Sequence, residues 1–210
     1  MPARAGLSTA RVVDVALAIV DEEGTDVLTL ARVAERAGVA APSLYKHVDG
    51  LAGLRRQVRL RVLEEFGEVL REATMGRSGP DALRAMAVAY RDYLRAHPHR
   101  YPFIEIAPGD PETTAAVDRV VEVGFAALRG YGMSRAEEVH AIRCVRAAVH
   151  GFTQLEALGG FGLPEDVDAS FGHLLDMVTD GVAAMSAAPA SAGLARSEPP
   201  RQGSTTRARK

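Results

Sequence analysis

Hydrophobic residues recur every three or four positions along most of this 210-residue chain. The first such stripe follows Ser8, a residue suited to cap a helix, and stops at Gly24; it consists of Val12, Val15, Ala16, Ile19 and Val20. No segment of the sequence shows the strict alternation of apolar and polar residues that marks a half-buried strand. The pattern therefore predicts an all-α fold.

Three further helices are expected before a loop at residues 76–80. A short helix begins at Thr29 and ends at Gly38, and a third runs from residue 41 to 48, where Asp49 and Gly50 break it. The fourth carries one apolar stripe, made of Leu54, Val58, Val62, Phe66, Val69 and Leu70.

The second half of the chain continues the helical pattern, over residues 81–97, 112–131, 134–158 and 164–187. A Pro-containing segment, residues 98–111, interrupts it and has room for one short helix. From residue 188 onward the chain is Ser, Pro, Ala, Gly and Arg without periodicity, which indicates a disordered basic tail. We therefore divide the chain into an N-terminal domain of residues 1–55, a C-terminal domain of residues 56–187 and a tail of residues 188–210.

Charge is distributed unevenly, although the net charge of the chain is only −2. Residues 30–62 contain seven basic and two acidic residues, so this segment carries +5. Nucleic acid would explain such a basic island, but so would a solvated surface, and charge alone does not decide between them.

Two features of the composition bear on location. Cys144 is the single cysteine, so no internal disulfide can form, which fits a reducing cytoplasm. No apolar run approaches the roughly 20 residues of a membrane span, and no signal-peptide pattern opens the chain. We expect a cytoplasmic protein with no membrane partner.

Residues 29–48 have the arrangement of a helix-turn-helix, with a turn at residues 37–39 and the small Ala34 where two helices must approach closely. Successive residues of an α-helix are rotated by about 100°, so the residues of the third helix fall into two sets on opposite sides. Its packing side consists of Ala41, Leu44, Tyr45 and Val48, and the other side of Pro42, Ser43, Lys46 and His47. The second group offers a hydroxyl, a cation and an imidazole for base edges and phosphates, and Arg55, Arg56, Arg59 and Arg61 follow it with further positive charge.

These residues resemble the TetR family of bacterial regulators, through LTLARVAERAGV and then Leu44-Tyr45-x-His47-Val48. The resemblance implies that Thr29 faces phosphate and that the DNA-facing residues of the third helix are Pro42, Ser43, Tyr45, Lys46 and His47. Two positions depart from the family: Leu51 stands where a phosphate-binding lysine is frequent, and Ala40 replaces the usual capping residue. Arg55 or Arg56 is the candidate to supply the missing phosphate contact.

Residues 81–187 are similar to a C-terminal domain class named for a Trp-x-x-x-His-Gly motif, through Arg146-Ala-Ala-Val-His150-Gly151-Phe152 and GGFGLPEDVDASF. Arg146 replaces the tryptophan. The resemblance implies an effector site inside a helical bundle and a homodimer through the helices at 134–158 and 164–187.

Several residues have two interpretations. Arg146 and His150, one turn apart, are either polar anchors for an effector, with Gly151 admitting a neighbouring element, or a core histidine bonded to a backbone carbonyl. Aromatic side chains either line a pocket or fill the core, namely Tyr90, Tyr93, Tyr101 and Phe103. The stripe of the last helix is either an intersubunit surface, which we favour, or core; it consists of Phe171, Leu174, Leu175, Val178, Val182 and Met185.

Other chemistry has little support in the sequence. His97 and His99 lack further ligands at metal-binding spacing, so we expect no metal and no cofactor, and we expect Cys144 to be a buried apolar residue. No enzyme motif is present. The sequence predicts a dimeric regulator, in which a small-molecule effector releases a repressor from an inverted-repeat operator; the alternative is a DNA-binding regulator controlled by a protein partner or by no ligand.

Overall fold

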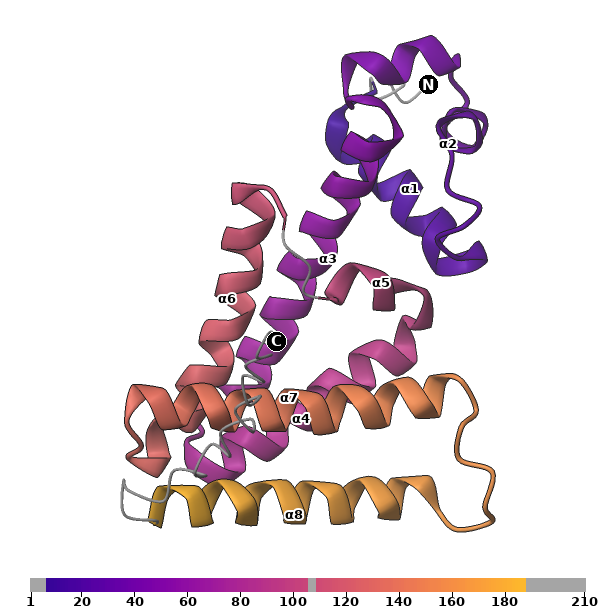
Figure 1. Ribbon diagram of the computed structural model, residues 1–210. Coiled ribbons are helices and arrows are strands. Elements are labelled where there is room, and N and C mark those ends of the chain that lie inside the picture. The colour runs from indigo at the N-terminus through magenta and orange to yellow at the C-terminus, as the bar shows by residue number, and fades with distance from the viewer. Residues whose placement is uncertain (1–6, 106–108, 188–210) are drawn as a thin grey trace, which may run out of the picture.

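The computed structural model describes residues 7–105 and 109–187, and every regular element in these two ranges is helical (Figure 1). This confirms the predicted all-α fold. The predicted tail at 188–210 lies outside the described residues. The elements are α1 Thr9–Glu23, α2 Leu30–Ala37, η1 Ala41–Lys46, α3 Gly50–Thr74, α4 Gly79–Ala96, η2 Pro98–Arg100, α5 Tyr101–Ile104, α6 Pro111–Leu128, η3 Arg129–Tyr131, α7 Arg135–Ala157 and α8 Val167–Ala187.

The first helix ends lie where the capping residues predict. The Ser8 hydroxyl accepts a hydrogen bond from the Arg11 N–H at 3.2 Å, and Thr29 does the same for Arg32 at 3.2 Å. Gly38 ends α2 in the left-handed conformation, with φ of 68° and ψ of 36°, which a side chain would strain. These local interactions fix the boundaries of α1 and α2.

The third helix differs from the prediction, because residues 41–46 form a 3₁₀ helix instead of an α-helix over 41–48. Its N-cap residue, Ala40, has no side-chain acceptor to hold the first turn. A 3₁₀ helix turns about 120° per residue, so Tyr45 lies in line with Pro42 and away from Leu44. Tyr45 is 64% exposed, and the prediction that it packs on the other two helices is wrong.

Helix α3 connects the two parts of the molecule (Figure 1). Its 25 residues span about 37 Å at 1.5 Å per residue. Near its start, Leu54 is fully buried in the same core as Leu44, and toward its end Phe66 and Leu70 are buried against the bundle formed by α4–α8. The predicted boundary at residues 55 and 56 therefore falls inside this helix, which both parts share.

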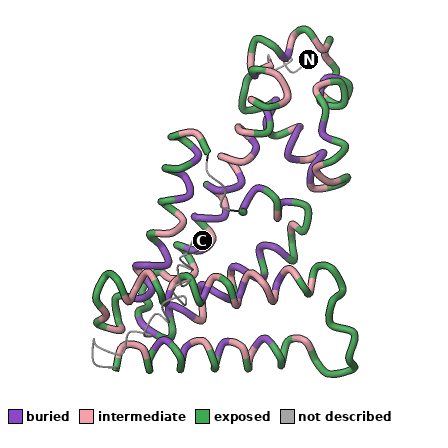
Figure 2. Tube along the Cα trace, in the orientation of Figure 1, coloured by how far each residue is buried: buried purple, intermediate pink, exposed green. Residues whose placement is uncertain are grey.

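Helices α7 and α8 lie side by side along the edge of the bundle farthest from the N-terminal helices (Figure 1). Buried and exposed residues alternate along α8, since one side faces the bundle and the other faces solvent (Figure 2). Phe171, Leu175 and Val182 are buried within their own chain. These three residues of the predicted stripe belong to the core of their own chain, packed on α7 and α4, whereas Leu174, Val178 and Met185 are half-buried; the dimer through α7 and α8 stays a prediction.

Two further residues of α7 differ from expectation. Cys144 is exposed, so it is not a buried apolar residue. A Cβ atom on Gly151 would meet no atom within 4 Å, so this glycine does not admit a neighbouring element. In the described ranges, no helix is both long and apolar enough to cross a bilayer.

Candidate functional site

The exposed side of the N-terminal helices carries most of the residues predicted to contact DNA. Thr29, Pro42, Tyr45 and Lys46 are exposed, and Ser43 and His47 are half-buried. Behind them, Leu44 and Val48 anchor η1 in the core. Ring, ammonium and hydroxyl groups thus lie together on one protruding segment, which suits insertion into the major groove of DNA.

The basic side chains near this segment differ in whether a carboxylate already neutralises them. Arg32 binds Glu23 at 3.0 Å and Glu35 at 3.2 Å, and Arg36 pairs with Glu22, so both arginines of α2 are neutralised by acidic neighbours. Lys46, in contrast, forms no ion pair with any residue that the structure describes. It is therefore the cation of this segment that is free to bind phosphate.

The arginines at the start of α3 point toward other parts of the chain. Arg55 donates to the Thr25 carbonyl oxygen at 3.1 Å and has no carboxylate partner among the described residues. Arg56 binds Asp110 at 3.2 Å and also pairs with Glu112, and Arg59 donates to the Glu105 carbonyl oxygen. Of the two candidates for the missing phosphate contact, Arg55 thus keeps its charge available, and Arg56 joins α3 to α6.

Asp110 also caps α6. Its carboxylate accepts hydrogen bonds from the Thr113 hydroxyl at 2.8 Å and from the backbone N–H groups of Glu112 and Thr113. The bonds from Thr113, with the nearby Arg56 charge, lower the pKa of Asp110 to about 2.

Arg100 joins the N-terminal helices to the bundle. Its guanidinium group binds both carboxylate oxygens of Asp21, at 2.7 Å each, and donates to Glu65 at 2.6 Å and to the Tyr93 hydroxyl at 2.9 Å. These partners lie on α1, α3 and α4, and Arg100 itself is only 6% exposed. The hydrogen bonds that Arg100 donates to Asp21 raise the pKa of Arg100 further above its ordinary value. The arginine therefore fixes the orientation of α1 relative to the bundle.

An apolar cavity of about 80 Å³ lies inside the bundle. It is partly open and lies between α3, α4, α6 and α7, with Ile104 of α5. The lining side chains that carry nitrogen or oxygen are Tyr90 and Arg146. The apolar lining consists of Leu63, Phe66, Leu70, Met86, Ala87, Ile104, Val117, Val120, Val121, Gly124, Ile142, Val145 and Val149.

His150 lies between two tyrosine hydroxyls. Its Nδ1 is 2.6 Å from the Tyr90 hydroxyl, and its Nε2 contacts the Tyr101 hydroxyl. Burial and the nearby Arg146 charge lower the pKa of His150, so its imidazole is neutral at pH 7. Burial raises the pKa of Tyr101 to about 12 and that of Tyr90 as well, so both phenols keep their protons. Neither interpretation of His150 is complete, since its partners are tyrosines and not a backbone carbonyl.

The structure separates the other residues predicted to bind an effector. Arg146 lines the cavity directly, and His150 and Tyr101 reach it through Tyr90. Tyr93 belongs to the Arg100 cluster, and Phe103 is buried beside the arginines of α3. No sequence pattern indicates the Arg100 cluster or the contribution of α6 to the cavity, because both depend on contacts between distant segments.

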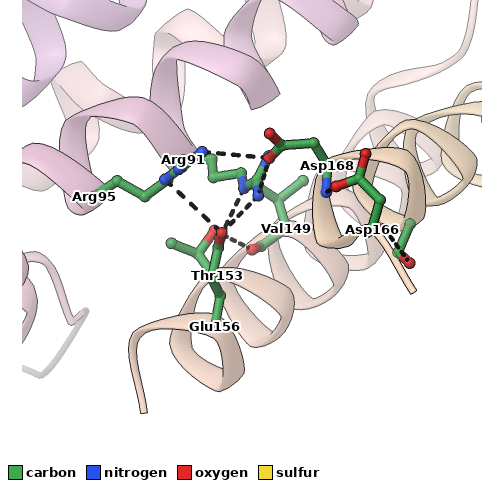
Figure 3. A network of polar contacts seen from close by, with 8 residues as sticks. Arg91, Arg95, Val149, Thr153, Glu156, Asp166 and Asp168 are labelled. Atoms are coloured by element: carbon green, nitrogen blue, oxygen red, sulfur yellow. Dashed lines mark hydrogen bonds and ion pairs between the residues drawn. The ribbon is translucent and has the colours of Figure 1, made fainter. Parts of the chain in front are cut away.

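A second buried arginine fixes α7 and α8 (Figure 3). Arg91, 5% exposed, binds Glu156 of α7 through two hydrogen bonds of 2.7 and 2.6 Å and Asp168 of α8 at 2.7 Å. Its guanidinium group also lies over the Phe171 ring, 4.5 Å from the centroid. The charge and hydrogen bond of Arg91 lower the pKa of Asp168. Both outer helices are thereby held to α4.

Comparison with known proteins gives two family matches. Residues 12–53 match the model described as bacterial regulatory proteins, tetR family, and residues 83–178 match the model described as tetracyclin repressor-like, C-terminal domain. The second description does not name the Trp-x-x-x-His-Gly class, so that assignment stays a prediction.

Relatives agree with these matches. The chain is 39% identical over 167 residues to the uncharacterized HTH-type transcriptional regulator Rv0681 of Mycobacterium tuberculosis, covering 78% of this chain and 75% of the relative. It is 32% identical over 169 residues to the uncharacterized HTH-type transcriptional regulator YobS of Bacillus subtilis, covering 80% of this chain and 88% of the relative. The fold is similar to that of the Streptomyces coelicolor TetR family protein ActR in complex with (S)-DNPA, with a TM-score of 0.62, 22% identity and coverage of 86% and 98%.

Proposed function

Because the chain belongs to the TetR family of DNA-binding transcriptional regulators, we propose that it is a dimeric repressor released from an inverted-repeat operator when a small molecule occupies the cavity beside α3. The observation that carries this proposal is the position of α3. One end of this helix holds the recognition segment in place through Leu54, and the other end lines the cavity through Leu63, Phe66 and Leu70.

On the DNA side, η1 is the recognition segment. The exposed Lys46 binds a phosphate, and Tyr45 with Pro42 offers apolar contact to the major groove, for instance to a thymine methyl group. Thr29 and Arg55 contact the backbone on either side, and Ser43 and His47 lie at the edge of the contact surface. A protein that reads DNA in this way acts in the cytoplasm, where the single Cys144 stays reduced.

The dimer forms through the outward sides of α7 and α8, which remain exposed after the stripe of α8 has packed into its own chain. On α7 the exposed positions follow one another at one or two helical turns: Ala136, His140, Cys144, Ala147 and Leu155. On α8 they include Met177, Gly181 and Ala184. Small side chains allow the α7–α8 pairs of two subunits to approach closely. Leu155 and Met177, which are 51% and 66% exposed in the single chain, then bury apolar surface in the dimer. The Arg91 ion pairs hold α7 and α8 in place relative to α4.

The cavity is the effector site. Its volume is below the roughly 300–1,000 Å³ of drug-sized ligand sites, so a ligand must displace the surrounding helices as it enters. Displacement of α3 changes the separation of the two recognition segments, which must match half-sites about 34–36 Å apart. A coupling of about 1–3 kcal/mol lowers operator affinity roughly 5–150-fold, which is enough for release. The cavity favours a small-molecule signal over control by a protein partner.

We also assign the C-terminal part to the Trp-x-x-x-His-Gly class, on the basis of His150 and Gly151.

The test begins with selection of binding sites from random-sequence DNA, which should yield an inverted repeat. Lys46→Ala should then weaken binding and reduce the slope of log affinity against log salt by about one, since one phosphate contact is lost. Arg71→Ala is the matched control, because Arg71 lies near the far end of α3, paired with Glu68, and its removal changes the net charge equally. Binding by Lys46→Ala equal to that of the parent at every salt concentration would exclude η1 as the recognition segment.

A further inference from the structure

Arg146 is a cation in the wall of an otherwise apolar cavity. It lies on α7, half-buried, and borders the same space as Tyr90 and thirteen side chains or glycines without polar side-chain atoms. A guanidinium group beside apolar surface is poorly hydrated, so it interacts strongly with any anion that reaches it.

Arg146 differs from the two buried arginines of the bundle in its ion pairs. Arg91 binds two carboxylates, those of Glu156 and Asp168, and Arg100 likewise binds Asp21 and Glu65. Arg146 has no ion pair or hydrogen bond with any side chain in residues 7–105 and 109–187. Its charge acts to lower the pKa of His150, Tyr90 and Tyr101, and it lines the same cavity as Tyr90, so it lies near this cluster. The two buried arginines are thus neutralised by carboxylates, whereas Arg146 has no carboxylate partner among the described residues.

The neighbouring His150 cluster supplies a second donor. A neutral imidazole has one N–H and one acceptor nitrogen. One of the two tyrosines therefore donates its proton to His150, and the other accepts the imidazole N–H and keeps its own O–H for a further partner. Among the described residues, neither tyrosine hydroxyl has another hydrogen bond. When Nδ1 carries the imidazole hydrogen, the Tyr90 O–H is the one left for a ligand, and Tyr90 lines the same cavity as Arg146.

We propose that the effector is a carboxylic acid with an apolar body, whose carboxylate binds Arg146 and the Tyr90 hydroxyl while the body fills the space between α3, α6 and α7. This deepens the proposed function and rests on it, since it takes the cavity to be the effector site. The carboxylate of Glu105 also acts on Tyr101 and His150, but it is exposed, does not line the cavity and forms no ion pair with Arg146. An amine is disfavoured by repulsion from Arg146, and an alcohol would leave the guanidinium without a counter-ion.

The experiment compares three probes of equal chain length: octanoate, 1-octanol and octylamine. Each is titrated calorimetrically into the full-length parent, Arg146→Gln and Arg143→Gln, and thermal unfolding by circular dichroism checks that each variant is folded. Arg143 is the matched control, because it is exposed on the same helix and does not line the cavity. Tyr90→Phe is a second variant that keeps the ring and removes the hydroxyl.

The parent should bind octanoate at least about tenfold more tightly than octanol, a difference of about 1.4 kcal/mol. In Arg146→Gln the affinity for octanoate should fall to that for octanol, while the affinity for octanol stays unchanged. Tyr90→Phe should reduce the affinity for octanoate by a smaller factor, and Arg143→Gln should bind both probes like the parent. Equal affinity of the parent for octanoate and octanol, tighter binding of octylamine, or full octanoate affinity in Arg146→Gln would overturn the acid class and leave the cavity as a sensor. Failure of all three probes to bind would overturn the cavity as the effector site, and the proposed function with it.

Discussion

Removal of the Arg100 guanidinium group should loosen α1 from the bundle. Arg100→Met keeps most of the alkyl stem but leaves Asp21 without the cation that it binds at 2.7 Å. Glu65 loses the Arg100 contact of 2.6 Å and keeps Arg61 at 2.8 Å. Breaking a buried ion pair by removing one partner costs about 3–5 kcal/mol. The Asp21 and Glu65 side chains are 28% and 35% exposed and can recover some hydration, so we expect a loss near the lower end, about 3 kcal/mol of unfolding free energy.

The assay is urea denaturation followed by far-UV circular dichroism, at one protein concentration because a dimer's stability depends on it. Arg95→Met is the control: Arg95 is 51% exposed, and its ion pairs measure 3.4 and 3.8 Å, so its loss should cost under about 1 kcal/mol. A double variant with Asp21→Asn should lose less than the two single variants added together. If Arg100→Met is as stable as Arg95→Met, or the double variant is additive, Arg100 does not join the two parts of the molecule.

Two other predictions concern the dimer and pH. Leu155→Glu, on the exposed side of α7, should give a folded monomer in sedimentation velocity, with Cys144 reacting faster with a thiol reagent than in the parent; Leu175→Glu, which faces the core at 7% exposure, should instead unfold. A dimeric Leu155→Glu with a protected thiol would place the interface elsewhere. Because the folded-state pKa of Asp110 is depressed to about 2 from 3.8, its stabilisation of α6 is present above about pH 4 and is lost as pH falls through 2. Asp110→Asn should therefore flatten the pH dependence of thermal stability between about pH 4 and 2, and an unchanged profile would remove Asp110 as its source.

Local chemistry made the first half of the fold predictable. Ser8, Thr29 and Gly38 satisfy backbone groups within a few residues of themselves, so the sequence contains the whole interaction. The same reasoning was wrong for residues 41–48, where a regular α-helix was assumed although Ala40 provides no cap. That error also placed Tyr45 on the packing side.

Tertiary contacts explain the remaining differences. An apolar stripe on α8 indicates burial but not whether the partner surface belongs to the same chain, and here Phe171, Leu175 and Val182 pack within their own chain. Arg100 and Asp21 are 79 residues apart in sequence, and no local pattern pairs them. Arg146 was identified because it replaces a family tryptophan, but only the structure shows that it borders an apolar cavity without a counter-ion.

The central claim is that ligand in the cavity and operator on η1 oppose one another through α3. Linkage requires each to weaken the other by the same factor. Octanoate is titrated into the protein with and without saturating operator DNA, and operator into the protein with and without saturating octanoate. The account predicts equal losses of affinity in the two directions, within about 5–150-fold. Equal octanoate affinities in the presence and absence of operator would contradict it.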